Sequence, residues 1–460
     1  MKRLLLLCLL FLPLLNQAQH RLGLHFMPWT YQSTLTNPAI AQPARFQLTV
    51  PIPIPTTGID LYHSGIKITD LVEDPQADIL TITPGAAIDA MPDESFLRGR
   101  SEVLLLASAF HLGKWQFGLH LSNHTEFMFG YHRDLFTLIS DGVGAHRGDE
   151  LQLAPNLGIS NYNQYAASAS RSIGEKWRIG ARVKLLGGVF HASTLPEHQS
   201  LTFAPSGENE DIHVGIDYAI RASTGLELGV EDWSQIGDQG INFQPEGLTG
   251  LNNPGIALDL GLQFEPIKNL VISASVVDLG QIKWQRLAQS YYFTGDYTFE
   301  GLPGFNEDGI NLSDPTWKNP AEAWASALDT LNGSFSYAQE SSPFTTSLPT
   351  RGYLTAQYRL FKILSVGAAW TGELYRETPT HAVSAWTGLH LGKWLTLGAN
   401  YTYDQRYQDM LGVHGRLNLG PMQFYASAGN ILPLIDPYST QSVSLILGSN
   451  YTFGRKKEKK

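Results

Sequence analysis

Charged residues are scarce in this chain, and cysteine is almost absent. Charged residues make up 16% of the 460 residues, against about a quarter in typical soluble domains. Aromatic residues reach 11%, and the charge balance is acidic, with 42 Asp and Glu against 32 Lys and Arg. An acidic balance argues against a nucleic-acid-binding surface. The composition favours a protein rich in β-strands whose surface faces something other than water over much of its area.

The single cysteine, Cys8, lies in an N-terminal stretch with the features of a secretory signal. Lys2 and Arg3 precede the apolar run "LLLLCLLFLPLL" (Leu4 to Leu15), and "NQAQ" follows as a cleavage region. The run is too short for a membrane-spanning helix, which needs about 20 residues. We therefore expect residues 1–19 to be a signal peptide. Its cleavage would leave a mature chain without a disulfide, a cysteine nucleophile or a thiolate metal site.

Long hydrophobic runs are also missing from the rest of the chain, and short alternating segments take their place. The phrase "HLGKW" occurs at 111–115 and again at 390–394. After the second copy, "LTLGANYTYD" (395–404) places apolar and aromatic side chains on one parity and mostly polar ones on the other. Alternation with period two over about ten residues indicates a strand with one apolar face. Two such strands joined by a Gly-Lys stretch form a β-hairpin, so the phrase predicts a repeated turn.

Three features favour an outer-membrane β-barrel over a soluble β-sandwich or propeller, whose strands would also alternate. The segments have about the 9–11 residues that a tilted strand needs to cross a bilayer. Short connections such as "LGKW", "GEKW" and "FKI" alternate with connections that are much longer, which is the asymmetry of such barrels. The chain also closes on "SVSLILGSNYTFG", where Tyr451 and Phe453 share one face, as in the assembly signal of outer-membrane barrels.

The fold class predicted is therefore all-β, a transmembrane antiparallel β-barrel of about 14 strands, in a range of about 12–16. Strands are expected near 101–111, 115–127, 163–172, 176–190, 255–265, 269–279, 352–361, 363–374, 381–391, 394–404, 411–419, 422–431 and 442–453. Residues 45–55 would add one more strand, although their prolines are unfavourable in a strand interior.

The domain layout follows from the direction of the last strand. If Phe453 closes the barrel at the periplasmic side, residues 191–254 and 280–351 form external loops. Residues 20–454 are then a single barrel domain, and "RKKEKK" (455–460) is a basic periplasmic tail. Within the longest loop, Asn319–Gly333 has the caps and apolar stripe of a helix. This helix could cover the pore or pack on other loops.

Polar-parity residues of the predicted strands are candidates for lining the lumen. Trp115 and Trp177 instead lie just past short turns on the apolar parity, where a periplasmic aromatic girdle is expected; Trp394 falls on the other parity. The lumen candidates are Lys176, Arg178, Arg182, Lys184, Asp259, Glu265, His120, His124 and Glu126. Since same-face neighbours on one strand lie about 7 Å apart, the two histidines and Glu126 cannot close around an ion by themselves. We interpret them as polar lining and expect no metal site.

The sharpest electrostatic pattern is the row of four cations on the strand at 176–190. A register that pairs Lys176 with Glu265 on the next predicted strand also sets Arg182 opposite Asp259. Such pairs contribute about 0.2–1 kcal/mol each. The alternative is an open, anion-selective pore lined by unpaired cations. We favour pairing, because clustered unpaired charge in a confined lumen is costly.

Three stretches carry a resemblance to a known family. "GIALDLGLQFEPIKNLVISASVVDLGQIKW" (Gly255 to Trp284) and "FTTSLPTRGYLTAQYRL" (Phe344 to Leu360) resemble uncharacterised outer-membrane β-barrel proteins of Bacteroidota, a family catalogued as a domain of unknown function. "LTNPAIAQP" (Leu35 to Pro43) is similar to the Asn-Pro-Ala motif of that family and of barrels like the long-chain fatty-acid transporters. The resemblance implies an outer-membrane barrel, with kinship to barrels that accompany type IX secretion, and it brings no active site.

The chain also lacks the motifs of common enzyme classes. It has no Gly-x-Ser-x-Gly, phosphate loop, dinucleotide fingerprint or His-Glu-x-x-His, so we expect no enzyme and no cofactor. One hypothesis is passive transport of a small solute, with hydrophobic solutes among the candidates. The other is a structural, assembly or secretion role in which the external loops bind a partner protein. Outer-membrane lipid, lipopolysaccharide and the barrel assembly machinery are the further partners expected of a barrel.

Overall fold

The protein is an all-β chain whose strands close into an antiparallel barrel. The computed structural model describes residues 22–27, 29–65, 67–71, 84–206, 211–224, 251–299, 305–306, 309–310, 333–375, 378–404, 408–435 and 441–455. The predicted signal peptide, nearly all of the basic tail and the predicted helix Asn319–Gly333, apart from its last residue, lie outside these described residues.

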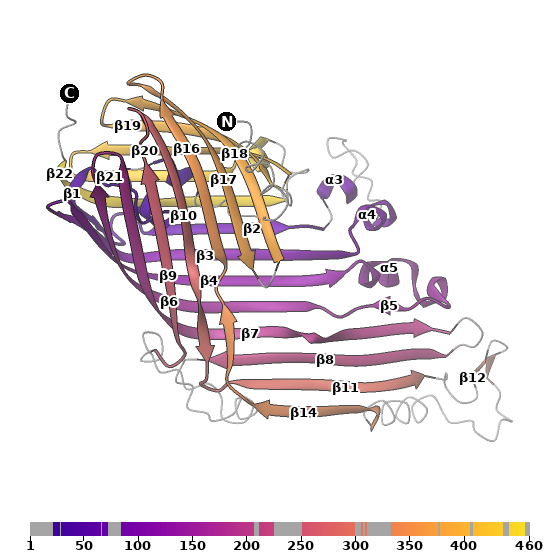
Figure 1. Cartoon of the computed structure of the whole chain (residues 1–460). Helices are drawn as coiled ribbons and strands as arrows, with labels where there is room; N and C mark the ends of the chain where they lie inside the picture. Colours follow the sequence, from indigo (N-terminus) through magenta and orange to yellow (C-terminus); the bar gives the residue numbers. More distant parts are fainter. Residues whose placement is uncertain are drawn as a thin grey trace, which may run out of the picture.

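The barrel has 14 strands, each hydrogen-bonded to its neighbours in antiparallel register. Its first wall strand is formed by two consecutive segments, β1 and β2, which both pair with β3 and with the last strand, β22. Figure 1 shows these strands wrapping around a common axis. In wall order the strands are β1 (Ala44–Thr49) with β2 (Thr56–His63), β3 (Glu94–Leu112), β4 (Trp115–His132), β6 (Asn156–Ile173), β7 (Trp177–Pro205), β9 (Pro254–Phe264), β10 (Leu270–Trp284), β16 (Thr350–Arg359), β17 (Leu364–Tyr375), β18 (Thr378–Leu391), β19 (Leu395–Asp404), β20 (Gln408–Leu419), β21 (Met422–Asn430) and β22 (Ser442–Arg455).

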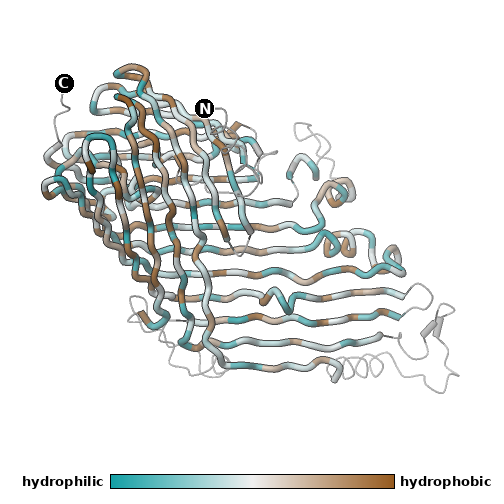
Figure 2. Tube along the Cα trace, in the orientation of Figure 1, coloured by the Kyte–Doolittle hydropathy of each residue, from teal (hydrophilic) through white to brown (hydrophobic). Residues whose placement is uncertain are grey.

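The alternation read from the sequence separates the two faces of the wall. Outward positions such as Leu119, Val183 and Leu397 are about half exposed, whereas inward Arg182 and Thr396 are buried. Brown and teal segments accordingly alternate along the barrel strands in Figure 2. The repeated turn phrase is explained by backbone geometry, because Gly113 and Gly392 both have a φ of 61°, which glycine adopts without steric cost.

Two irregular strands show how the wall departs from the sequence prediction. The prolines in 51–55 interrupt the first wall strand, as expected, but the strand resumes as β2 and runs to His63, beyond the predicted end at residue 55. In β3 the register shifts between Leu104 and Leu106. Leu104 is buried while Leu106 is 48% exposed, so this β-bulge explains why leucines of this strand occupy both parities.

The segments predicted as external loops contain further strands. The first half of β7 pairs with β9, and its second half leaves the barrel and pairs with β8 (Ile212–Thr224). β11 (Gln289–Phe299) and β14 (Phe335–Ser341) extend this sheet, as seen in the lower part of Figure 1. The predicted external ranges 191–254 and 280–351 are thus partly sheet. Shorter elements in these ranges are β12 (Phe305–Asn306), β13 (Gly309–Ile310) and β15 (Phe344–Ser347), and β5 (Leu151–Gln152) pairs with the second half of β7.

The remaining elements are short helices. They are α2 (Leu22–His25), η1 (Tyr31–Leu35), α3 (Ile68–Leu71), α4 (Pro84–Ala90), α5 (Asp134–Asp141), η2 (Val143–His146) and α8 (Leu432–Ile435). Within the described ranges, no helix combines the length and apolar character needed to cross a membrane.

Aromatic side chains mark the short-turn end of the outer face. Trp115 and Trp177 are 41% and 43% exposed, and Trp177 stacks on Phe264 with ring centroids 4.0 Å apart. Trp394 is also exposed, but it lies in the turn before β19 rather than on a strand. Phe453 stacks on Phe46 across the seam between β22 and β1. An aromatic band at a barrel end is typical of the membrane interface, while the assembly-signal role of Tyr451 and Phe453 stays a prediction.

Candidate functional site in the barrel lumen

The lumen contains the chain's own N-terminal segment. Residues 22–43, which we call the plug, include α2 and η1 and precede the first wall strand. Leu22, Phe26, Met27 and Ile40 are at most 1% exposed. Leu22 and Phe26 cluster with Ala369 and Trp386, and Met27 clusters with Tyr425 and Ile446, all at inward positions of wall strands. The plug therefore occupies the space that an open pore would need.

A pair of facing glycines seats the Asn37-Pro38-Ala39 part of the plug. Gly180 on β7 and Gly261 on β9 are directly paired. A Cβ built on Gly180 would lie 2.5 Å from the Pro38 carbonyl carbon, and one on Gly261 would lie 2.0 Å from Asn37 Oδ1. The absence of side chains at these two inward positions lets the plug backbone touch the wall.

Polar side chains fasten the plug to strands around the barrel. On β9 and β10, the Asn37 amide donates to the carbonyl oxygens of Leu262 and Ala274, at 3.2 and 3.3 Å. On the far wall, Gln32 and Asn450 of β22 exchange two amide hydrogen bonds of 3.0 and 2.9 Å. Further contacts join Tyr31 to His120, Gln42 to Gln116, His25 to Thr355, Ser275 to the Thr36 carbonyl, Phe26 to Trp386, and Trp29 to Arg416.

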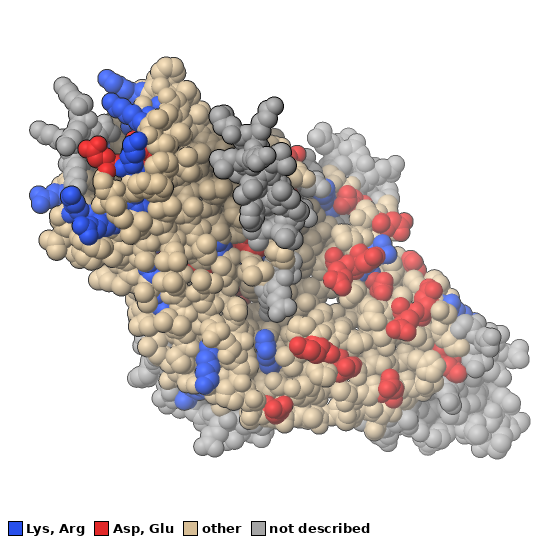
Figure 3. Space-filling model, viewed as in Figure 1, with Lys and Arg blue, Asp and Glu red and all other residues tan. Residues whose placement is uncertain are grey.

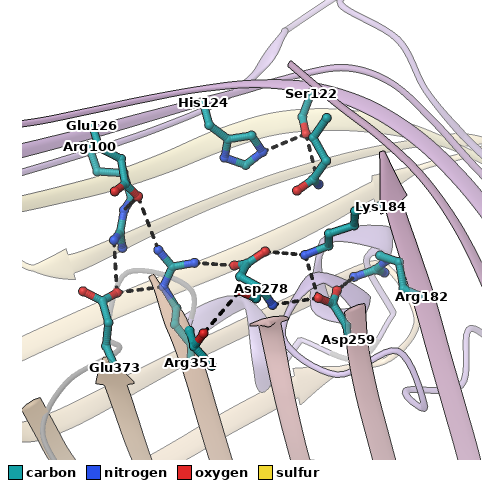
Figure 4. Close-up of polar contacts among 12 residues, drawn as sticks. Arg100, Ser122, His124, Glu126, Arg182, Lys184, Asp259, Asp278, Arg351 and Glu373 are labelled. Carbon is teal, nitrogen blue, oxygen red and sulfur yellow. Dashed lines mark hydrogen bonds and ion pairs between the residues drawn. The ribbon is translucent and has the colours of Figure 1, made fainter. Parts of the chain in front are cut away.

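Nine buried or nearly buried charged side chains form a continuous layer of ion pairs across the lumen. On one side, Arg182 binds Asp259 at 3.0 Å, and Lys184 binds Asp259 at 2.7 Å and also Asp278. The layer continues through Arg351, Glu373, Arg100 and Glu126 (Figure 4). Arg98 joins it by an ion pair to Glu373. We call these nine residues the charge layer.

The charge layer joins walls that are not neighbours. Arg98 on β3 binds Glu373 on β17 at 2.7 Å, and Arg351 on β16 lies 3.6 Å from Glu126 on β4. β3 and β4 are separated from β16 and β17 by several strands in either direction around the barrel. These bonds therefore span the lumen between opposite walls at this level. In a low-dielectric interior such charges are stable only when they are mutually paired and hydrogen-bonded.

A β-bulge in β10 places one carboxylate of this layer. The register of β10 against β9 shifts between Val276 and Leu279, and Asp278 within this bulge has a φ of 62°. Its backbone N–H donates to Asp259 Oδ1 at 2.8 Å, while its carboxylate binds Lys184 and Arg351. Bulges commonly re-aim a side chain in this way.

Arg182 joins the charge layer to the plug. Its side chain is 1% exposed, and it donates to the Thr34 carbonyl at 2.9 Å and to Thr34 Oγ1 at 3.1 Å as well as to Asp259. The pairing of Arg182 with Asp259 is the one expected from the alternation. Lys184 is also in the layer, whereas Arg178 instead donates to Gln116, Ser170 and Ser172 beside the plug.

Lys176, the outermost cation of the predicted row, and its expected partner Glu265 are not part of the charge layer. The backbone N–H of Glu265 donates to the Lys176 carbonyl at 2.8 Å, so the expected register is present, but both residues are exposed in the turn region. The Glu265 carboxylate accepts a bond from the Asn269 backbone N–H. These two side chains are at the mouth rather than in the lumen, because strands end here.

The predicted polar face of β4 points inward, and its side chains contact either the plug or the charge layer. His120 contacts Tyr31 of the plug at 3.0 Å and Gln164 at 2.7 Å. His124 bonds Ser122 at 2.9 Å and stacks on Tyr162, and Glu126 joins the charge layer. Within the described residues, no group of histidines, cysteines and carboxylates could hold a metal ion.

Sequence reasoning missed the plug and five of the nine charge-layer residues, namely Arg98, Arg100, Asp278, Arg351 and Glu373. Arg98, Arg100 and Arg351 lie just outside the predicted strand ends, and the bulge takes Asp278 off a simple alternation. The plug had a usable signal. Residues 22–40 are rich in apolar side chains without period-two alternation, so they could be neither a wall strand nor a solvated leader.

One plug residue gives the site a pH dependence. His25 bonds the hydroxyls of Thr36 and Thr355, stacks on Tyr353 and lies edge-on to Phe26. Burial lowers the pKa of His25 from 6.5 to about 4. The docked plug therefore holds His25 neutral, whereas a released plug would protonate below pH 6.5.

We expect acidification to loosen the plug. Between pH 6.5 and 4 the released state binds a proton that the docked state does not, so each unit of acidification favours release by up to about tenfold. The check is protease cleavage of residues 22–43 in reconstituted protein between pH 7.5 and 4.5. His25→Gln should reduce this pH dependence, although other histidines that contact the plug, such as His120, remain; an identical pH response in the variant would contradict the assignment.

A comparison with protein families identifies the chain. The family model matches residues 38–429. The chain belongs to DUF5723, a family of unknown function. The match begins at Pro38 in the plug and ends just before the last residue of β21. Comparison with functionally curated proteins gives no match.

This DUF5723 member also has structural likenesses among solved barrels. A Pseudomonas putida toluene transporter, TodX, has 12% identity and a TM-score of 0.41, covering 92% of this chain and 93% of TodX. The Ralstonia pickettii toluene transporter TbuX has 11% identity and a TM-score of 0.40, with 92% and 94% covered. A Pseudomonas aeruginosa FadL homologue has 13% identity and a TM-score of 0.42, with 96% and 99% covered. The solutes in these names are those of the named proteins and are not assigned to this chain.

Proposed function

We propose that the protein is an outer-membrane channel for a small solute, held closed by the plug and the charge layer, with hydrophobic solutes among the candidates. The observation that carries the proposal is the way the lumen is filled. The lumen is filled in part by the plug, a separate chain segment that belongs to no wall strand of the described structure.

The fastening of the plug supports displacement rather than permanent closure. Side-chain hydrogen bonds such as Gln32 to Asn450 and Asn37 to the Leu262 carbonyl hold it. A neutral hydrogen bond contributes about 0.5–1.5 kcal/mol net, because water can replace either partner. Releasing the plug would break such bonds and expose its buried apolar side chains, but it would leave the barrel ladders intact. The charge layer is a second barrier, whose pairs would have to separate or rearrange.

Planar-bilayer recording of the whole chain and of a variant lacking residues 20–43 tests the proposal. We expect the whole chain to show rare, brief openings and the shortened variant to show sustained conductance steps, because the loss of Thr34 removes two of the bonds that hold Arg182 in the charge layer and lets the layer rearrange. Heat-modifiable migration on gels confirms that each protein is a folded barrel. A folded, shortened barrel that never conducts would contradict the channel proposal.

A structural or assembly role is the second candidate, and the sheet formed by β8, β11 and β14 beyond the barrel favours it. On one face of this sheet Phe293 of β11 lies between Tyr218 of β8 and Tyr337 of β14. Phe293 and Tyr337 are 40% and 56% exposed. Exposed aromatic side chains are common in protein interfaces. A plug that never moves, together with a partner that co-purifies through β8, β11 and β14, would favour this role over transport.

A further inference from the structure

The bilayer-facing wall contains an apolar groove that the proposed channel does not use. The groove has a volume of about 720 Å³ and lies over β7, β9, β10, β16 and β17. Its lining begins at Ile179, two positions beyond the girdle residue Trp177 on the same face. From there the groove extends to Thr350 and Leu374, at the ends of β16 and β17 that lie away from the short turn between them. Figure 3 shows this wall as a broad surface on which Lys, Arg, Asp and Glu are sparse.

Glycines produce the groove. Strand registers place Leu260, Val276, Gly352 and Gly372 side by side in one outward row. The row thus changes from branched aliphatic side chains on β9 and β10 to glycines, which have no side chain, on β16 and β17. The space above Gly352 is bounded by the Trp370 ring, 3.5 Å from where a Cβ would lie, and Leu354 rises beside it as a half-exposed wall. Small residues at adjacent outward positions leave a depression that no described residue of the chain fills.

The chemistry of the groove selects its occupant. Its lining is almost wholly apolar, and its volume is in the range of pockets that hold ligands, about 300–1,000 Å³. Water placed there would lack the polar partners that it needs, and an empty depression would forfeit dispersion contacts with its walls. A flexible hydrocarbon chain from the surrounding bilayer meets both requirements.

We propose that this groove is a binding site for the hydrocarbon chain of a membrane lipid. The inference is independent of transport and rests on the continuity of the groove with the lipid-facing wall. Directly behind it, Arg351 and Glu373 form a buried 2.8 Å ion pair of the charge layer, each adjacent in sequence to one of the groove glycines. A hydrocarbon chain bound in the groove would add apolar cover over this ion pair, at Gly352 and Gly372, where the wall has no outward side chains.

Photolabelling localises the occupant. Wild-type protein is reconstituted in liposomes that contain a phospholipid with a diazirine in the middle of an acyl chain, irradiated, and mapped by mass spectrometry. We expect label on Leu260, Val276 and Leu354 to exceed several-fold the label on Val413, an outward residue on another wall. Equal labelling around the barrel, or a cross-link to a second protein copy in place of lipid, would overturn the proposal.

Two matched substitutions test the groove itself. Ala274 lines it, whereas Ala385 is an outward alanine on β18 outside it. Ala274→Phe should reduce the groove labelling to the level at Val413, and Ala385→Phe should leave it unchanged. Unchanged labelling in folded Ala274→Phe would contradict the site. Heat-modifiable migration establishes folding, and if Ala274→Phe does not insert, the wild-type distribution decides alone.

Discussion

Gly180→Val is expected to open the barrel by unseating the plug. A side chain at Gly180 would meet the Pro38 carbonyl carbon and oxygen at 2.5 Å and the Ala39 nitrogen at 2.6 Å. These are backbone atoms, so no rotamer change relieves the overlap. Valine is favourable in a strand, so β7 should form and the plug should yield. We expect sustained conductance close to that of the variant lacking residues 20–43.

Gly415→Val is the matched control. The atoms nearest to a Cβ at Gly415 are Leu397 Cδ2 at 3.5 Å and the Thr396 carbonyl at 3.9 Å, which are ordinary contacts. This variant should conduct like the wild type. If Gly180→Val also conducts like the wild type and keeps residues 22–43 protected from protease, the seat of the plug has been wrongly assigned.

Reversing the charge of Arg182 is expected to cause the largest loss of stability. Arg182→Asp would bring two carboxylates together at a position that is buried and would remove both bonds to Thr34. Breaking a buried ion pair costs about 3–5 kcal/mol, because the remaining charge stays uncompensated. We expect the free energy of unfolding in lipid vesicles, measured in urea, to fall by about that amount.

A second substitution, Asp259→Arg, and a control, Lys176→Asp, test whether the loss of stability comes from the buried ion pair. Adding Asp259→Arg should restore stability only in part, since Asp259 also binds Lys184 and accepts the Asp278 N–H. Lys176→Asp, at the exposed end of the same predicted row, should change stability little, because exposed pairs contribute about 0–1 kcal/mol. If Arg182→Asp leaves stability unchanged and instead abolishes anion conductance, the charge layer would be a selectivity element rather than a closure.

The wall of the barrel was predictable because its physical constraint is local. Each strand must alternate every second residue, and each short turn needs a residue such as Gly113 that tolerates positive φ. Alternation also fixed the register that sets Arg182 opposite Asp259, since a one-residue slip would turn every side chain to the other face.

The closure of the lumen was not predictable by the same reasoning. Arg98 and Glu373 meet across the barrel although they are 275 residues apart in sequence, and no periodicity reports such a contact. The plug has neither strand nor long-helix periodicity, so its burial follows only once the barrel around it is known. The β10 bulge that presents Asp278 likewise depends on tertiary contacts rather than on a local pattern.

The bonds between Gln32 and Asn450 bear on the order of assembly. Gln32 is among the first residues of the described chain, whereas Asn450 lies in β22, the strand that closes the barrel against β1. Because β22 is the last wall strand in the sequence, we expect it to pair with β1 after the other strands have formed. We therefore expect the plug to complete its docking only after β22 has paired with β1. Protection of residues 22–43 from protease would then report the final step of barrel formation.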